Sequence, residues 1–148
     1  MRKQYHFRAS ERGLLAWDVD RLIVLTRNLP RVQVPLAAIR ELDEAFWFGN
    51  GTSPTCRAIV EHARLIEAAD LRFPIIFSAD GRVMDGMHRV AKAVLLGQTT
   101  IETVQFGVDP EPDYVGVHPD ELPYEEINTE FSPPRHKGTK GDGTMGKC

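Results

Sequence analysis

The sequence contains only two cysteines, Cys56 and Cys148, and they lie far apart along the chain. Two widely separated cysteines cannot form a disulfide framework, and they lack the spacing of a zinc site. No stretch approaches the roughly 20 consecutive apolar residues that a membrane span needs, and no apolar run near the first residue is typical of a signal peptide. We therefore expect a cytoplasmic protein that does not enter the membrane.

The chain also lacks an excess of basic residues. Its 148 residues carry a net charge of −3, and this charge is unevenly divided. Residues 128–148 contain four basic and two acidic residues, which leaves 14 basic and 19 acidic residues, a net charge of −5, in residues 1–127. Proteins that bind duplex nucleic acid usually present a basic face to the phosphates. The acidic balance argues against nucleic acid as the main partner.

Composition divides the chain into a folded part and a tail. Residues 128–148 hold four glycines and two prolines but few large apolar side chains, so they cannot bury enough surface to offset the entropy lost on ordering. We predict that this tail is disordered. Residues 107–127 carry four prolines among acids and aromatics, which predicts an irregular segment that wraps against the domain. Residues 1–127 as a whole are predicted to form a single domain.

Hydrophobic spacing predicts alternating helices and strands. Asp18 is a predicted N-cap for a helix over 19–28, and Ser53 with Pro54 is predicted to open a helix that ends near residue 70. The predicted strands lie near 31–34, 74–77, 82–84 and 100–106, with a helical turn near 36–42 and a last helix that ends before Gly97. The expected fold class is therefore α+β, with a small mixed β-sheet flanked by helices. The residues assigned to the core are Leu14, Leu22, Leu25, Ile59, Ile66, Ile75, Val83, Val94, Leu95 and Ile101.

The segment Asp85-Gly86-Met87-His88-Arg89 lies at a predicted junction between a strand and a helix. A glycine there lets the backbone approach a ligand closely, and the first N–H groups of a helix attract anions. Arg89 could pair with a phosphate, His88 could donate a second hydrogen bond, and Asp85 could hold a phosphate-bound Mg²⁺ or orient Arg89. The alternative is a tight turn in which Asp85 is only an N-cap and Arg89 pairs with a neighbouring acid.

This segment and its surroundings resemble the ParB/sulfiredoxin-like superfamily. The pattern is a hairpin with a D-G turn, followed by a D-G-x-H-R-like turn that opens a helix. It covers residues 74–106, with a looser match back to about residue 31. The resemblance implies that the turn holds the phosphates of a nucleotide, for which we consider ATP, ADP and CTP with Mg²⁺. The backbone of residues 86–88 would then offer donors, while Arg89 neutralises phosphate charge.

Departures from the family patterns narrow the expected activity. Sulfiredoxins carry a nucleophilic cysteine where this chain has Met87, and a thioether cannot act as that nucleophile. Partition-type ParB proteins carry a G-E-R-R motif for CTP, of which Gly86 and Arg89 remain, and they continue into a helix-turn-helix region that the sequence after Phe106 does not predict. The turn is most similar to that of the ParB-like free-serine kinases, which transfer a phosphoryl group to a small hydroxyl compound.

Other candidate residues lie outside the turn. Glu44 could act as a general base for a substrate hydroxyl if the fold brings it to the helix start, and an exposed acidic helix end is the alternative. His62 has no second histidine or acid four residues away, so we interpret it as structural or solvated. The aromatic residues could stack on a base or contact a protein partner or a second copy, although packing is their more usual role. They are Phe46, Trp47 and Phe48.

The leading hypothesis is a domain that binds nucleotide phosphates and could transfer a phosphoryl group to a small hydroxyl compound. Asp85, which would also help to place Mg²⁺, and Glu44 are the catalytic candidates. Whether the domain is an enzyme stays open, because a non-catalytic module that senses a nucleotide or binds a protein is the alternative. DNA binding or cleavage related to chromosome partitioning is a weaker alternative because of the acidic charge.

Overall fold

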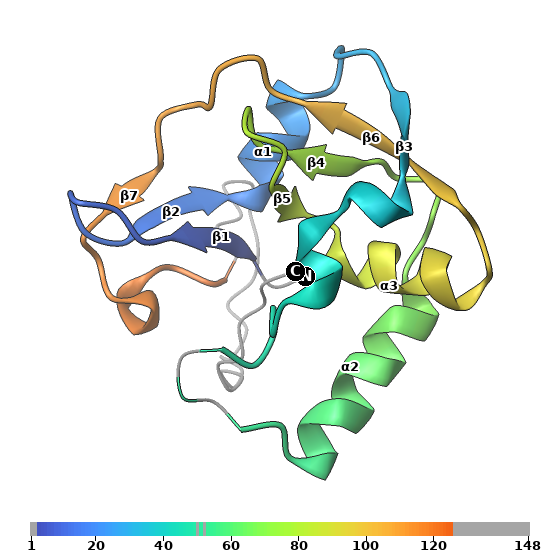
Figure 1. The fold of residues 1–148 in the computed structure, drawn as a ribbon. Helices are drawn as coiled ribbons and strands as arrows, with labels where there is room; N and C mark the ends of the chain where they lie inside the picture. Colours follow the sequence, from blue (N-terminus) through green and yellow to red (C-terminus); the bar gives the residue numbers. More distant parts are fainter. Residues whose placement is uncertain (1–2, 50, 52, 126–148) are drawn as a thin grey trace, which may run out of the picture. The chain divides into compact units, whose positions relative to one another are not determined.

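The structure is a computed structural model, and it describes residues 3–49, 51 and 53–125 (Figure 1). In this part of the chain, three α-helices and two small β-sheets form a mixed α+β structure. The contacts divide it into two compact units. The first unit contains residues 3–24 and 111–125, and the second contains residues 25–110.

The first unit is built on a three-stranded antiparallel sheet. Its strands, in spatial order, are β1 (Tyr5–Arg8), β2 (Leu15–Asp18) and β7 (Tyr114–Val115). The buried centre contains Tyr5, Ala16 and Leu122, and the ring of Tyr124 meets that of Tyr5 edge-on at 5.3 Å. The sequence analysis predicted neither β1 nor β2, whose burial does not alternate: one buried residue precedes three half-buried ones in β1, and three buried residues follow one another in β2.

Two further segments, which lie mostly in the first unit, match their predictions in part. Helix α1 (Val19–Leu25) follows Asp18, whose Oδ1 accepts a hydrogen bond from the amide of Asp20 at 2.9 Å. The helix ends three residues before the predicted residue 28. The segment predicted to be irregular contains β7 and a short 3₁₀ helix, η3 (Pro119–Glu121). The predicted disordered tail lies outside the described residues.

The second unit contains a four-stranded mixed sheet with the strand order β3-β6-β4-β5. Strand β4 runs parallel to β6, and the other neighbouring pairs are antiparallel. All four strands predicted here are confirmed to within one or two residues. Two 3₁₀ helices, η1 (Leu36–Ala38) and η2 (Arg40–Asp43), occupy the predicted helical turn. The strands are β3 (Val32–Pro35), β4 (Ile75–Phe77), β5 (Val83–Asp85) and β6 (Thr100–Gln105).

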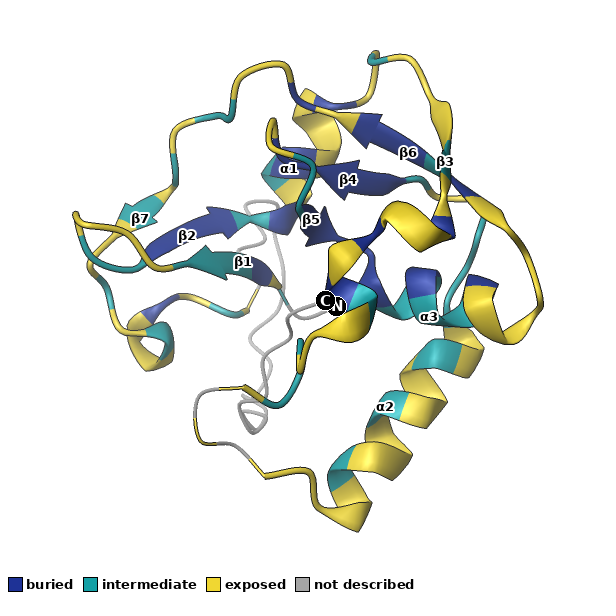
Figure 2. Cartoon of the chain, viewed as in Figure 1, coloured by how far each residue is buried: buried dark blue, intermediate teal, exposed yellow. Residues whose placement is uncertain are grey.

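Helix α3 (Met87–Leu95) packs against this sheet and contributes to its core (Figure 2). Met87, Val90 and Ala93 are buried, so the inner face follows a spacing of three residues. The prediction that Val94 and Leu95 belong to the core was wrong, because they are 46% and 75% exposed. At about 100° per residue, Leu95 lies about 140° around the helix from Val90 and so faces away from the buried side. Val94 lies only about 40° from Val90, but it is in the last turn of α3.

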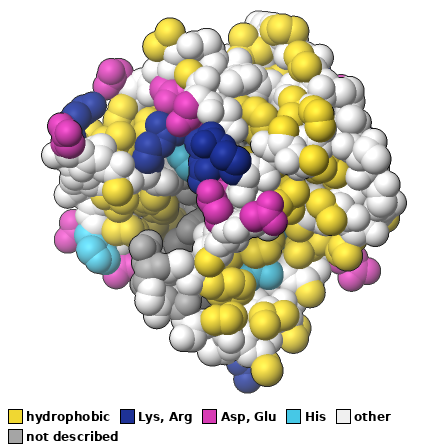
Figure 3. Space-filling view, viewed as in Figure 1, with side chains coloured by type: hydrophobic (Ala, Val, Ile, Leu, Met, Phe, Trp, Pro, Cys, Tyr) yellow, Lys and Arg dark blue, Asp and Glu magenta, His cyan; other side chains and the backbone are white. Residues whose placement is uncertain are grey.

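Helix α2 (Cys56–Ala68) contacts α3 but has no buried residue. The predicted start at Ser53 and Pro54 was wrong: Thr55 is the N-cap, and its Oγ1 accepts a hydrogen bond from the amide of Ala58 at 3.1 Å. Figure 3 shows hydrophobic side chains gathered on the face where α2 lies. Among the other predicted core residues, Leu22, Ile75, Val83 and Ile101 are buried, Leu14 and Ile66 are half-buried, and Leu25 and Ile59 are exposed.

Candidate functional site

The turn singled out from the sequence lies between the end of β5 at Asp85 and the start of α3 at Met87. Gly86 is the N-cap, with the left-handed angles φ 113° and ψ 19°. A Cβ added to Gly86 would lie 2.7 Å from Cδ1 of Ile75 and 2.9 Å from Nη2 of Arg89. Both the backbone conformation and the close packing therefore require glycine here.

Asp85 and Arg89 form an ion pair across the first turn of α3. Nη2 of Arg89 donates a hydrogen bond to Oδ2 of Asp85 at 2.8 Å, and the two side chains are 15% and 10% exposed, respectively. The pair neutralises both charges locally and fixes the guanidinium next to the backbone of Gly86. The space directly over Gly86 is consequently filled by Arg89 and Ile75.

His88, in the first turn of α3, contacts His62 of α2. Nε2 of His88 and Nδ1 of His62 lie 2.8 Å apart, and the ring planes differ by 21°. The two imidazoles thus lie nearly in one plane, joined edge to edge by a hydrogen bond. The sequence analysis missed this contact, because 26 residues separate the two histidines and no local spacing connects them.

Trp47 covers the two histidines. Its ring stacks on His62 with 4.3 Å between centroids and on His88 with 4.5 Å, at interplanar angles of 19° and 14°. Phe46 meets Trp47 edge-on, and Phe48 meets His62 in the same way. The packing role that we considered usual for these aromatics is the one seen here. Nε1 of Trp47 is buried and has no hydrogen-bond partner among the described residues.

This environment keeps the imidazole of His88 uncharged near neutral pH. Burial, with smaller contributions from His62 and Arg89, lowers the pKa of His88 to about 4. Burial disfavours the charged form of an imidazole, and a cationic neighbour acts in the same direction. Arg89 is therefore the cationic side chain of the turn, while His88 is a neutral hydrogen-bonding group.

Glu44, the proposed general base, pairs with Arg82. Nη1 and Nη2 of Arg82 donate to the two carboxylate oxygens of Glu44 at 2.9 and 2.6 Å. These hydrogen bonds are the largest cause that lowers the pKa of Glu44 below its usual value. Because a carboxylate with a lowered pKa is a weaker base, the contacts of Glu44 add no support to its predicted role.

A second acid on the same arginine, Glu41, was not singled out from the sequence. Only 2% of its side chain is exposed, and its Oε2 lies 2.8 Å from the amide of Val83 and 3.0 Å from Nε of Arg82. Its Oε1 is buried without a hydrogen-bond partner among the described residues. Glu41 joins η2 to the start of β5, the strand that leads into the turn. Glu41 lies in the run Arg40-Glu41-Leu42-Asp43-Glu44, where nothing in the sequence distinguishes it from the other acids.

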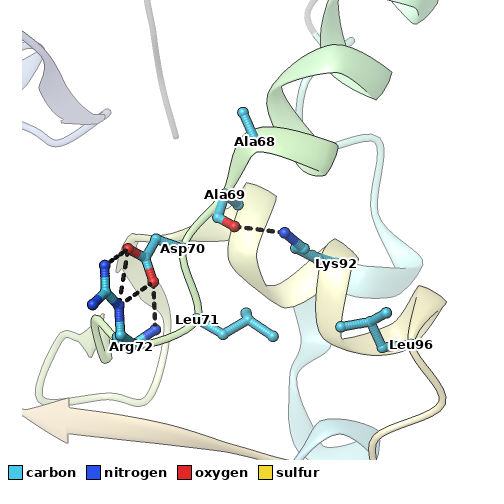
Figure 4. A pocket seen from close by; sticks show the side chains of 7 residues that line it. All are labelled: Ala68, Ala69, Asp70, Leu71, Arg72, Lys92 and Leu96. Carbon is cyan, nitrogen blue, oxygen red and sulfur yellow. Dashed lines mark hydrogen bonds and ion pairs between the residues drawn. The ribbon is translucent and has the colours of Figure 1, made fainter.

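A shallow hollow of about 600 Å³ lies where α2 ends beside α3 (Figure 4). Nζ of Lys92 donates hydrogen bonds to the carbonyl oxygens of Glu67 and Ala69, at 2.9 and 2.8 Å. Asp70 and Arg72 at its edge pair with each other. Lys92 thus satisfies carbonyl groups at the end of α2, which is a structural role.

The structure offers no additional support for a bound metal. Among the described residues, no group of three or more His, Cys, Asp or Glu side chains could hold a metal ion. Contact of Asp85 with Mg²⁺ stays a prediction, and in the structure this carboxylate is paired with Arg89. In the same part of the chain, no helix has the length and apolar character required to cross a membrane.

No family model, curated protein or solved structure matches this chain. The function of the site is therefore inferred from its residues and their geometry.

Proposed function

We propose that the second unit is a ParB/sulfiredoxin-like domain that binds the phosphate groups of a nucleotide at the first turn of α3. The observation that carries this proposal is the position of Arg89, whose guanidinium is held beside Gly86 at the start of a nine-residue helix. A helix start and a guanidinium both attract anions, and here they occupy the same turn. The D-G-x-H-R-like pattern supports the same function.

The close packing over Gly86 restricts where the phosphate binds. Because Ile75 and Arg89 fill the space that a Cβ would take, we place the phosphate against the amides of the first turn and the guanidinium of Arg89. Arg89 has five N–H donors, so one guanidinium can pair with Asp85 and with a phosphate. Asp85 is then the residue that orients Arg89, one of the two roles expected for it.

The contacts of the two catalytic candidates favour binding without turnover. Asp85 is paired with Arg89, and Glu44 is paired with Arg82. The hydrogen bonds from Arg82 lower the pKa of Glu44 and so weaken it as a base, and the Asp85 carboxylate is engaged by Arg89. We therefore propose a nucleotide-binding or nucleotide-sensing module, and phosphoryl transfer to a small hydroxyl compound is the activity to be tested against it.

The test is thermal and chemical unfolding with ATP, ADP or CTP, each with Mg²⁺. A ligand that binds only the folded protein at roughly 100 times its Kd stabilises it by about 2.7 kcal/mol. Arg89→Lys, which keeps a positive charge beside Asp85, is expected to weaken binding roughly tenfold, because the planar guanidinium is lost. Arg57→Ala removes an exposed arginine on α2 and should leave binding unchanged.

Two outcomes would contradict the proposal. If none of the three nucleotides stabilises the wild-type protein, the turn is not a nucleotide site. If the nucleotide binds equally well to wild type and to Arg89→Lys and Arg89→Ala, it binds elsewhere. Consumption of the nucleotide in the presence of small alcohols, with phosphorylation of the alcohol, would show that the module is an enzyme.

A further inference from the structure

The contact between His62 and His88 connects two helices that are distant in sequence. His62 lies on the half-buried face of α2, and His88 lies in the first turn of α3 next to Arg89. No local sequence pattern connects the two histidines, yet their two nitrogens lie 2.8 Å apart. An interaction from α2 thus reaches a residue of the proposed phosphate site.

The distance between the nitrogens limits how the pair can be protonated. A hydrogen bond between two imidazole nitrogens needs one N–H donor and one nitrogen with a free lone pair. With hydrogens on both Nε2 of His88 and Nδ1 of His62, the two N–H groups would repel each other at 2.8 Å. Only one hydrogen can therefore lie between the two nitrogens, so the tautomer of one ring determines that of the other.

Trp47 restricts rotation of both rings. It stacks nearly parallel on each imidazole, at 4.5 Å from His88 and 4.3 Å from His62. Rotation of either imidazole out of the common plane would break the hydrogen bond and the stacking contact of that ring with Trp47. His88 is thus fixed from α2 through the hydrogen bond and from the aromatic segment through stacking.

The charged and titratable neighbours of His88 come from three elements. His62 faces it from α2, Arg89 follows it on α3, and Asp85, at the end of β5, pairs with Arg89. Trp47 adds apolar cover without a charge. In this setting, without a bound ligand, the imidazole of His88 is neutral near neutral pH because its pKa is lowered to about 4, chiefly by burial.

From this geometry, and resting on the proposed phosphate site, we infer that His62 is a positioning residue that holds His88 in one orientation and one tautomer beside the first turn of α3. His62 acts through His88 and needs no contact with the nucleotide. The site then recognises phosphate with one fixed cation, Arg89, and one neutral imidazole. Loss of His62 frees the ring of His88 and allows it to become protonated.

The first experiment follows the imidazole resonances by NMR as the pH is lowered. In the wild type, the His88 resonance is expected to titrate near pH 4, as its environment lowers the pKa. In His62→Ala, the midpoint should rise by about one unit or more towards the ordinary value near 6.5. In His62→Gln, which keeps a hydrogen-bonding group, the midpoint of the His88 titration should rise less. His118→Ala, in the other unit, should leave this midpoint unchanged.

The second experiment measures binding of ATP at pH 7.5 and pH 5.5 for the same variants. The Kd of each variant is expressed relative to that of the wild type at the same pH, which cancels the effect of nucleotide protonation. On this relative scale, His62→Ala should bind ATP several-fold more tightly at pH 5.5 than at pH 7.5, because protonated His88 attracts phosphate. Addition of His88→Gln to His62→Ala should remove this pH dependence. A residue with only a structural role would not change the pH profile in this way.

Different results would overturn the proposed nucleotide site and the inferred positioning role of His62. A His88 midpoint near 6.5 in the wild type, or one that is the same in His62→Ala, overturns the inference even if nucleotides bind. A pH profile of binding that is the same in His62→Ala as in the wild type also overturns it. Absence of nucleotide binding by the wild type overturns the proposed function, and the NMR titration then still decides whether His62 positions His88.

Discussion

Helices α2 and α3 contact each other but depend on different interactions. Met87, Val90 and Ala93 of α3 lie in the core of the second unit, whereas α2 has no buried residue. Helix α3 is consequently stabilised by packing, and α2 by its N-cap and by its half-buried face. Both helices nonetheless contribute to the candidate site, α3 through Arg89 and α2 through His62.

Because only α3 has residues in the core, substitutions in the two helices should have different effects on stability and on the candidate site. A substitution in the core face of α3 should unfold the unit, so its effect on a ligand cannot be interpreted. A substitution on α2 should leave the unit folded and alter the site through His62. Helix α2 is therefore the better place to perturb His88 without losing the fold.

The largest predicted effect comes from a charge in the core face of α3. Val90 is 0% exposed, and Val90→Asp would bury an unpaired carboxylate. We expect a loss of more than about 4 kcal/mol in the free energy of unfolding. Val60→Asp, at a site on α2 that is 66% exposed, should change it by less than about 0.5 kcal/mol. Urea unfolding monitored by circular dichroism measures both, and equal losses would refute the contrast between the helices.

The next largest effect concerns the start of α3. Gly86→Ala combines a left-handed backbone with contacts of 2.7 Å to Ile75 and 2.9 Å to Arg89, and we expect a cost of about 3 kcal/mol. Gly97, after α3, has a φ of 79° but nothing within 4 Å of an added Cβ. Gly97→Ala should cost about 1 kcal/mol. If the two variants unfold at the same urea concentration, the close packing over Gly86 has no energetic effect.

Much of the second unit could be predicted from sequence because its signals are local. The strand near Ile75 is a continuous apolar run, and the glycine in the D-G dipeptide at 85–86 marks the left-handed start of α3. Asp85 and Arg89 are four residues apart, a spacing at which an ion pair can form. The alternative that we kept for Arg89, pairing with a neighbouring acid, describes this contact.

The remainder of the site depends on contacts that no local pattern encodes. His62 reaches His88 across 26 residues, and Glu41 reaches Val83 across 42. Helical periodicity also places residues on a stripe without fixing which stripe faces the sheet or where along the helix burial ends. Val94 and Leu95 were therefore assigned to the core although they are exposed.

A smaller effect is expected when the pH is lowered. The pKa of His88 is about 4 in the folded chain and near 6.5 in the unfolded chain. Between these values the unfolded chain binds more protons at this site, so stability falls as the pH falls from about 6.5 to about 4. Since His88 is only partly buried, we expect a loss of about 2 kcal/mol.

The variant His88→Gln isolates the contribution of this imidazole from that of the carboxylates. Urea unfolding at pH 7 and pH 4.5 should show a smaller pH-dependent loss in His88→Gln than in the wild type. Equal losses in the two proteins would mean that His88 is not buried against His62 and Trp47 as the structure has it.

The smallest predicted effect concerns the start of α2. Oγ1 of Thr55 accepts a hydrogen bond from the amide of Ala58, so Thr55→Ala leaves a helix donor without its cap and should cost about 1 kcal/mol. Ser53→Ala, at the residue that the sequence indicated as the cap, should cost less than about 0.3 kcal/mol.

Because α2 has no buried residue, the loss in Thr55→Ala should appear as faster amide hydrogen exchange within α2 and leave exchange in α3 nearly unchanged. Faster exchange in both helices would mean that α2 and α3 unfold together, and their separation into a functional and a stabilising helix would then be wrong.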